Sequence, residues 1–258
     1  MNVQPIAPIQ LVYCLGFVLV ACAGSFAYGL KLERSLAVGT VRTFAQLLLV
    51  GYVLDYIFEI RQIWLILLVF TWMVFWATHT IWLRVRQKEV PIFVRTFFSM
   101  LVSYLSVSIL VTAVIVQVET WWEPQYFIPL SGMIMGNSMN AIALALDRMF
   151  SDMRKQRPQV ELALCLGATY QEATADILRA AMHAGMTPSI NALMTVGLVS
   201  LPGMMTGQLL GGSDPQTAVK YQIIVMLMLV ASTAIGTIIV VLWVRRSCFT
   251  RAHQMVLK

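Results

Sequence analysis

The fold of this chain is decided around residues 160–188, which read VELALCLGATYQEATADILRAAMHAGMTP. This stretch is charged and amphipathic, whereas the sequence on both sides of it is strongly apolar. The 258-residue chain as a whole is 59% hydrophobic and 12% charged, with a mean hydropathy of +0.77. Soluble domains average about 45–50% apolar and 25% charged residues. The composition therefore indicates an integral membrane protein, with residues 160–188 as a docking element outside the apolar blocks.

Long apolar runs predict membrane-spanning helices. A bilayer core of roughly 30 Å needs about 20 mostly apolar helical residues, and only helices or closed barrels satisfy the backbone within lipid. We predict seven spans, at about residues 9–30, 36–57, 63–83, 93–117, 126–146, 189–211 and 221–244. The expected fold class is all-α, a single polytopic transmembrane domain over residues 1–258.

The distribution of Lys and Arg predicts the orientation, because these residues are retained on the cytoplasmic side. Fifteen of the eighteen lie on alternate connections: Lys31, Arg34, Arg84, Arg86, Lys88, Arg95, Arg148, Arg154, Lys155, Arg157, Arg179, Arg245, Arg246, Arg251 and Lys258. Arg61 and Lys220 lie on the other side, and Arg42 falls within the second span. We therefore expect the N-terminus outside and the C-terminus inside.

The net charge of +6 thus reports membrane topology and not a nucleic-acid partner. Residues 1–10 carry no charge, so they lack the basic region of a secretory signal, and we expect the first span to be retained. Since no transit peptide is visible, the expected location is a bacterial cytoplasmic membrane.

Motifs for catalysis are missing from the sequence. It contains no GxxxxGK[ST], GxSxG, HExxH or GxGxxG pattern. The histidines are scattered at His79, His183 and His253, and the four cysteines form no CxxC pair. We therefore expect no enzyme and no cofactor bound by this chain, so that energy for any transport comes from a partner or an ion gradient.

The connection at about residues 147–188 is too polar to span a membrane and too rich in helix formers to be a loose loop. We expect one helix to end near Leu166, with Gly167 as a left-handed C-cap. A second helix should begin at Thr169 as N-cap, with Glu172 completing a capping box, and stop near Ala184, before Gly185 and Pro188. The connection should form a compact helix-turn-helix element on the cytoplasmic face.

Two apolar spans carry residues that a transport path could use. Gly203 and Gly207 follow Pro202 on one face of the expected sixth span and fit either close packing or a gate with a hinge. Met133, Asn137 and Asn140 share a face of the fifth span and, with Met204 and Met205, are the candidate translocation path. Thioethers prefer soft ions, but methionines also fill gaps in packing. The sequence leaves any metal ligands unknown.

Glu161 and Gly167 stand six residues apart, a spacing that resembles the Glu-Ala-Ala-x3-Gly loop of ABC importer permeases. Leu162 replaces the first Ala of that loop, and its Ile-x-Leu-Pro ending is absent. Longer blocks resemble the FetB-type iron-export ABC permeases, relatives of the plant aluminium-tolerance permeases: IPLSGMIMGNSM (128–139), LCLGAT (164–169), TVGLVSLPGMMTGQLLGGSDPQTAVKYQI (195–223), RRSCFTRAHQ (245–254) and VRTFAQLLLVGYVL (41–54).

The resemblance implies a permease that pairs with a separate ATP-binding cassette subunit, two copies of each, with ATP and Mg²⁺ on the partner. It implies ATPase-coupling roles for Glu161, Gly167, Ala168, Thr169 and Glu172, and export of iron or another metal species. The residues alone leave two other functions open, a stand-alone channel or secondary transporter and a scaffold for other membrane proteins. The cytoplasmic helical element favours the ABC permease.

Overall fold

The computed structural model describes residues 7–85, 90–117, 119–250 and 254–256. The expected roles of Arg86, Lys88, Arg251, His253 and Lys258 lie outside these ranges. The described residues form helices joined by turns, with two isolated bridges, Val196 to Ser200 and Phe249 to Met255. The elements are α1 (Pro8–Ala27), α2 (Glu33–Ile60), α3 (Ile63–Arg84), α4 (Ile92–Ile109), the π-helix η1 (Leu110–Ile115), α5 (Pro124–Lys155), α6 (Arg157–Cys165), α7 (Tyr170–Ala173), α8 (Ala175–Thr195), α9 (Gly203–Leu210) and α10 (Pro215–Ser247).

The all-α membrane fold is confirmed. Six helices of the described chain are long and apolar enough to cross a membrane: α1, α2, α3, α4 continued by η1, α5 and α10. The chain divides into two compact units, Met1–Arg61 with Leu210–Gly212, and Gln62–Leu209 with Ser213–Lys258. The expectation of a single transmembrane domain stays a prediction.

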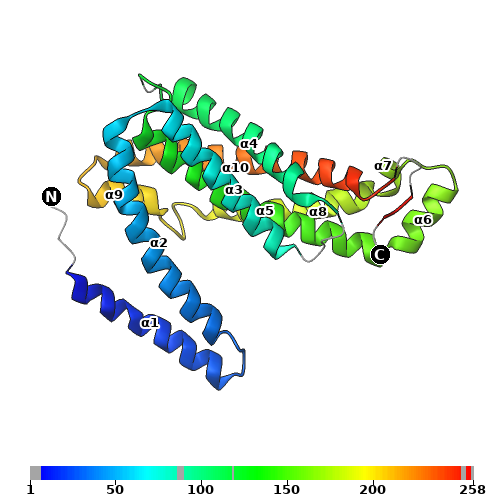
Figure 1. The fold of residues 1–258 in the computed structure, drawn as a ribbon, viewed down its shortest axis with the longest axis horizontal. Helices are drawn as coiled ribbons and strands as arrows, with labels where there is room; N and C mark the ends of the chain where they lie inside the picture. The colour runs from blue at the N-terminus through cyan, green and yellow to red at the C-terminus, as the bar shows by residue number, and fades with distance from the viewer. Residues whose placement is uncertain (1–6, 86–89, 118, 251–253, 257–258) are drawn as a thin grey trace. The chain divides into compact units, whose positions relative to one another are not determined.

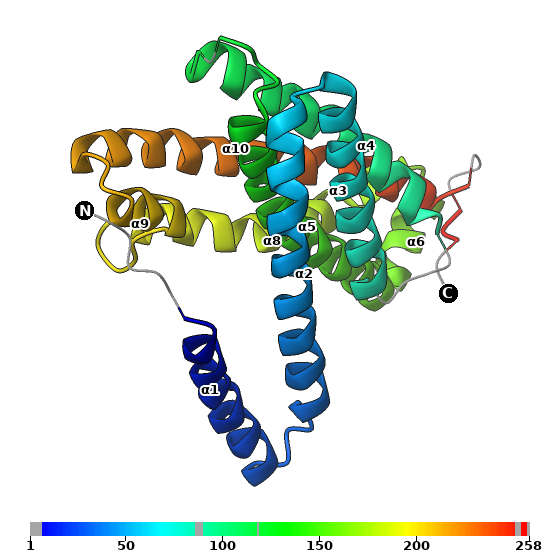
Figure 2. The same ribbon diagram turned by 60° about the vertical axis from the view of Figure 1, so that its left-hand side comes forward.

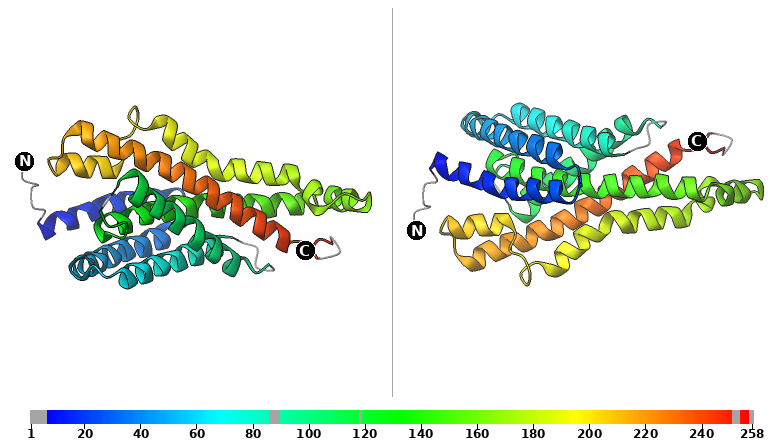
Figure 3. Two further views of the ribbon diagram at one scale, coloured as in Figure 1. Left: turned by 90° about the horizontal axis from the view of Figure 1, so that it is seen from above. Right: turned by 90° about the horizontal axis from the view of Figure 1, so that it is seen from below.

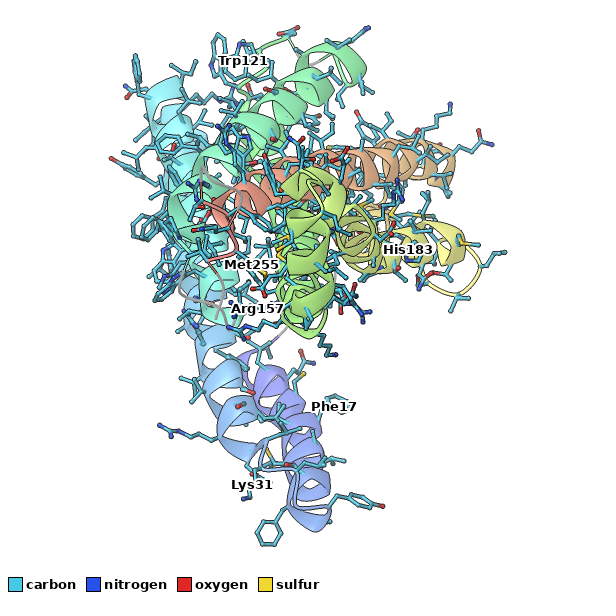
Figure 4. The ribbon with its side chains drawn as sticks, turned by 90° about the vertical axis from the view of Figure 1, so that its right-hand side faces the viewer. Phe17, Lys31, Trp121, Arg157, His183 and Met255 are labelled. Atoms are coloured by element: carbon cyan, nitrogen blue, oxygen red, sulfur yellow. The ribbon has the colours of Figure 1, made fainter. Side chains whose placement is uncertain are left out.

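The first unit contains the helical hairpin of α1 and α2. The Ser25 hydroxyl closes its turn, donating to Oε1 of Glu33 at 2.7 Å and accepting from the Leu32 N–H at 3.0 Å. Figure 2 shows the two helices joined by this short turn, and Figure 4 shows Lys31 within it and Phe17 projecting from α1. The apolar side chains of both helices are almost all exposed, as is appropriate for spans whose solvent is lipid.

The second unit is a bundle around α5, which packs against α3, α4, α8 and α10 (Figure 1). Its core includes the fully buried side chains of Phe70, Tyr104, Phe127 and Ile142. The rings of Phe70 on α3 and Phe127 on α5 lie 5.6 Å apart, centroid to centroid. The core is therefore built mainly from large apolar side chains at helix crossings.

The expected sixth span, residues 189–211, is not a continuous helix. Helix α8 ends at Thr195, residues 196–202 are non-helical with Gly197 at a φ of +81°, and α9 begins at Gly203. The eight residues of α9 extend about 12 Å, too short to cross a membrane. Pro202 precedes α9 and so lies in a link between two helices, not within one.

The expectation that Gly185 and Pro188 stop a helix is wrong, because α8 continues through both residues to Thr195. Gly185 is buried where α8 crosses α5, at a point that leaves no room for a side chain. Packing of α8 against α5 therefore outweighs the backbone hydrogen bond that Pro188 removes.

Candidate functional site

Helices α5 and α8 form an arm that carries the polar connection. The 32 residues of α5 extend about 48 Å, well beyond a bilayer core of roughly 30 Å. In both views of Figure 3, α5 and α8 reach together past the rest of the bundle toward α6. Near the end of α5, Arg148 pairs with the buried Asp152 at 2.6 Å, which stabilises the last turns of this helix.

The turn after α6 has the geometry that the sequence predicts. Gly167 adopts a φ of +95°, and the Ala168 N–H donates to the Ala163 carbonyl at 3.0 Å. The Gly167 N–H donates to the Leu164 carbonyl at 3.1 Å, so the last carbonyls of α6 are satisfied as at a typical glycine C-cap. The predicted left-handed C-cap is confirmed.

The predicted capping box is also confirmed. Oε2 of Glu172 accepts the Thr169 N–H and hydroxyl, both at 2.8 Å, and Oγ1 of Thr169 accepts the Glu172 N–H at 3.3 Å. The hydrogen bond from the Thr169 backbone N–H, followed by that from its hydroxyl, lowers the pKa of the Glu172 carboxyl. The cap is therefore strongest with Glu172 ionised.

The helix after this cap is shorter than expected. Helix α7 holds four residues and ends at Ala173. The hydroxyl of its C-cap residue, Thr174, donates back to the Tyr170 carbonyl at 2.7 Å before α8 begins. We refer to α6, α7 and their turn, residues 157–173, as the knob. Its surface is partly apolar, because Leu162 and Leu166, one helical turn apart, are 61% and 80% exposed. Glu161 lies beside them, paired with Arg157 at 2.7 Å.

The knob contacts the end of α10 through aromatic and cationic side chains. The rings of Tyr170 and Phe249 lie 5.4 Å apart between centroids, and Cζ of Arg245 lies 5.6 Å from the Tyr170 ring centroid. The end of α10 is drawn next to α7 in Figure 1. Sequence reasoning missed this contact. Its only local signal was the run of arginine and aromatic residues after the last span.

A cavity of about 300 Å³ lies where α5, the link 196–202, α9 and α10 meet. Five of the residues singled out from the sequence line it: Met133, Asn137, Pro202, Gly203 and Met204. Met205 lines an adjoining cavity of about 350 Å³ that shares Pro202 with the first. The structure thus brings together residues from the expected fifth and sixth spans.

Asn140 and Gly207 are not among the described residues that line these two cavities. Asn140 accepts a hydrogen bond from Nη1 of Arg84 on α3. A Cβ on Gly203 or Gly207 would meet nothing within 4 Å, so no helix of the described chain packs closely on that glycine face. If these glycines serve close packing, the helix that packs on them is not among the described residues of this chain.

Sequence reasoning missed the α10 side of the cavity, which includes the potential ligand side chains of Gln222 and Met226. Gln222 is buried, and its Oε1 has no hydrogen-bond partner within the described part of the chain. The cavity thus offers neutral donors, the amides of Asn137 and Gln222 and the thioethers of three methionines. None of its described lining residues carries a carboxylate, imidazole or thiol, and no group of three His, Cys, Asp or Glu side chains suited to a metal occurs among the described residues.

The profile of the uncharacterised protein family UPF0014 matches residues 8–249. The chain belongs to this family. This UPF0014 chain is 37% identical over 243 residues to a UPF0014 membrane protein of Synechocystis, covering 94% of each chain. It is 34% identical over 257 residues to the probable iron export permease protein FetB of Escherichia coli, covering 99% of this chain and 97% of that one.

A plant relative also matches the UPF0014 chain. The protein ALUMINUM SENSITIVE 3 of Arabidopsis thaliana is 34% identical over 239 residues, covering 92% of this chain and 86% of the plant protein. The resemblance to FetB-type permeases and their plant relatives is thereby confirmed. No solved structure matches significantly.

Proposed function

We propose that this chain is the permease subunit of an ABC transporter that pairs with a separate ATP-binding cassette subunit and exports iron or another metal species. The knob carries this proposal, since it presents Leu162 and Leu166 to solvent at the end of an arm longer than a bilayer needs. Two exposed leucines on an otherwise polar helix are typical of a helix that binds in an apolar groove of a partner protein. The name of the Escherichia coli relative, probable iron export permease protein FetB, supports the transport role.

The proposed coupling runs along α8. This helix is continuous for 21 residues, about 30 Å, from the knob to the link at residues 196–202. Several residues of the link, among them Pro202, line the cavity. When the ATPase closes and moves the knob, α8 transmits the displacement as a rigid rod, and the link with Pro202, Gly203 and Gly207 acts as gate and hinge. Glu161, Gly167, Ala168, Thr169 and Glu172 form or shape the ATPase-facing surface.

The cavity is the proposed translocation path, with Met133, Asn137 and Met204 on its wall and Met205 and Asn140 nearby on the same helices. Iron and aluminium ions favour oxygen donors, whereas thioethers favour soft ions. Because the described lining has amide and hydroxyl oxygens but no carboxylate, we expect a hard metal to cross together with its own anionic ligands. A bare soft cation would instead use the methionine sulfurs.

The complete transporter in this proposal has two permeases and two ATPases in a bacterial cytoplasmic membrane. The N-terminus lies outside and the C-terminus inside, following the distribution of Lys and Arg. ATP and Mg²⁺ bind the partner, and nucleic acid has no part.

The first test is purification of this chain after co-expression with its candidate ATPase, followed by ATPase assays in lipid with and without metals. A stable complex with metal-stimulated turnover supports the proposal. Absence of any complex from a folded protein would favour the self-sufficient channel or secondary transporter.

The second test uses Glu161→Lys and Gly167→Val, which change the knob, with Glu59→Lys on α2 as a matched charge reversal away from it. We expect both knob variants to lose ATPase stimulation while remaining in the membrane and the control to keep it. Unchanged stimulation in folded knob variants contradicts the mechanism.

A further inference from the structure

A second cavity, of about 560 Å³, lies at the other end of α10 from the proposed path. It is formed by the first turn of α4 and the last turn of α10, and its lining includes Arg95, Trp243, Arg246 and Phe249. We propose that this cavity, the headgroup pocket, binds the phosphate of an anionic phospholipid. The pocket shares no described lining residue with the cavity near Pro202.

The charge of the pocket calls for an anion. Arg95 and Arg246 both line it, and no described lining residue is acidic. Nη1 of Arg95 is buried and has no hydrogen-bond partner among the residues that the structure describes. A buried guanidinium N–H without an acceptor is costly, and a phosphate oxygen is the acceptor that arginine pairs with most strongly. Binding of a phosphate would therefore satisfy Arg95 and offset the repulsion between the two arginines.

The surroundings favour a lipid over a soluble anion. The pocket lies where one apolar helix begins and another ends, and Trp243 is 49% exposed there, as expected for an aromatic residue at a membrane interface. On α4, Val94, Phe98 and Val102 recur every four residues and are 57%, 52% and 64% exposed. This apolar stripe begins next to Arg95 in the sequence and offers an acyl chain a path along the helix. Anionic lipids are concentrated in the cytoplasmic leaflet, the side on which we place Arg95 and Arg246.

Occupancy of the pocket also bears on the knob. Phe249 lines the pocket and packs against Tyr170 of α7, with ring centroids 5.4 Å apart. A bound headgroup that fixes the position of Phe249 would also fix the surface against which Tyr170 of α7 packs. An effect of lipid on coupling rests on the proposed ABC function, whereas lipid binding itself does not depend on it.

The test measures lipid binding to the full purified chain in detergent by native mass spectrometry, without any ATPase. The probes are phosphatidylglycerol, phosphatidylcholine with the same acyl chains, and inorganic phosphate. We expect phosphatidylglycerol to bind roughly tenfold more tightly than phosphatidylcholine. Equal binding of the two lipids would overturn the proposal. Binding of inorganic phosphate, together with equal binding of the two lipids, would instead assign the pocket to a soluble anion.

The variants locate the site. Arg95→Gln combined with Arg246→Gln should abolish the preference for phosphatidylglycerol, and Lys220→Gln, a charge removal at the other end of α10, should keep it. Arg246 is exposed, so Arg246→Gln alone should fold and weaken the preference even if the double variant does not fold. A preference unchanged in Arg246→Gln and in the double variant would show that the lipid binds elsewhere.

Discussion

A Cβ atom on Gly185 would lie 2.7 Å from the carbonyl oxygen of Ala141 and 2.9 Å from Cβ of Ala145. Backbone of α8 thus lies directly against α5, at the base of the arm that carries the knob. Larger side chains at position 185 must force the two helices apart.

We expect Gly185→Leu to destabilise the protein by about 1–3 kcal/mol, the usual cost of overpacking. Thermal unfolding in detergent measures this as a lower Tm. Gly136→Ala on α5 is the matched control, because its Cβ would meet nothing within 4 Å, and its Tm should stay equal or rise. A wild-type Tm for Gly185→Leu would mean that the helices do not touch at this point.

A second close approach joins α10 and α4. A Cβ on Gly236 would lie 2.5 Å from the hydroxyl oxygen of Tyr104 and 2.8 Å from a ring carbon. We expect Gly236→Ala to lower the Tm, and Tyr104→Phe to recover part of the loss because it removes the nearest atom. A double-mutant cycle should give a coupling energy of about 0.5–3 kcal/mol. Strict additivity of the two changes would contradict the contact.

The capping box should make the start of α7 sensitive to acid. The pKa of Glu172 is lowered from its ordinary value of 4.5 by the Thr169 hydrogen bonds, so the folded state favours the ionised carboxyl. This contribution is fully present above the unfolded pKa and is lost as the pH falls through the lower, folded value.

Hydrogen exchange of residues 170–173, corrected for intrinsic rates, should therefore show protection at neutral pH that falls below about pH 4.5. Glu172→Gln can still accept a hydrogen bond but cannot titrate, so its protection should be independent of pH over this range. The same acid loss in Glu172→Gln would assign the effect to another group.

The Tyr170 ring joins the knob to the end of α10. Under the proposed ABC function, Tyr170→Ala should weaken ATPase stimulation by about 0.5–2 kcal/mol of coupling, while Tyr170→Phe, which keeps the ring against Phe249, should retain it. Assays of ATPase activity with the reconstituted partner measure this difference. Equal losses in both variants would place the effect on the hydroxyl and not on ring packing.

By contrast, the ion pair of Glu161 with Arg157 contributes little to stability. Both side chains are nearly half exposed, at 47% and 43%, and such surface pairs are worth about 0–1 kcal/mol. Glu161→Gln should leave the Tm unchanged within error. A large loss of Tm would show that this carboxylate supports the fold, and any loss of coupling in Glu161 variants could then not be assigned to the ATPase contact.

Part of the candidate site could be predicted from the sequence, and part depends on contacts between helices that are distant in sequence. Met133 and Asn137 were predicted to share a face of one helix from their spacing, and Met204 was assigned to the same path; all three line one cavity. Asn140 shares their face in the sequence but bonds Arg84 on a different helix. Gln222 and Met226 could not be found, because nothing in their own segment reveals which neighbour they meet.

The sequence by itself determined the membrane class, the long apolar helices, the glycine turn at Gly167 and the cap at Thr169. These depend on composition and on contacts within three or four residues, where the free energy is set locally. Only the tertiary structure decided that α8 runs through Gly185 and Pro188, that the chain breaks at residues 196–202, and that Phe249 meets Tyr170. Packing between segments distant in sequence outweighs local propensity at these points, and a single sequence does not state which segments meet.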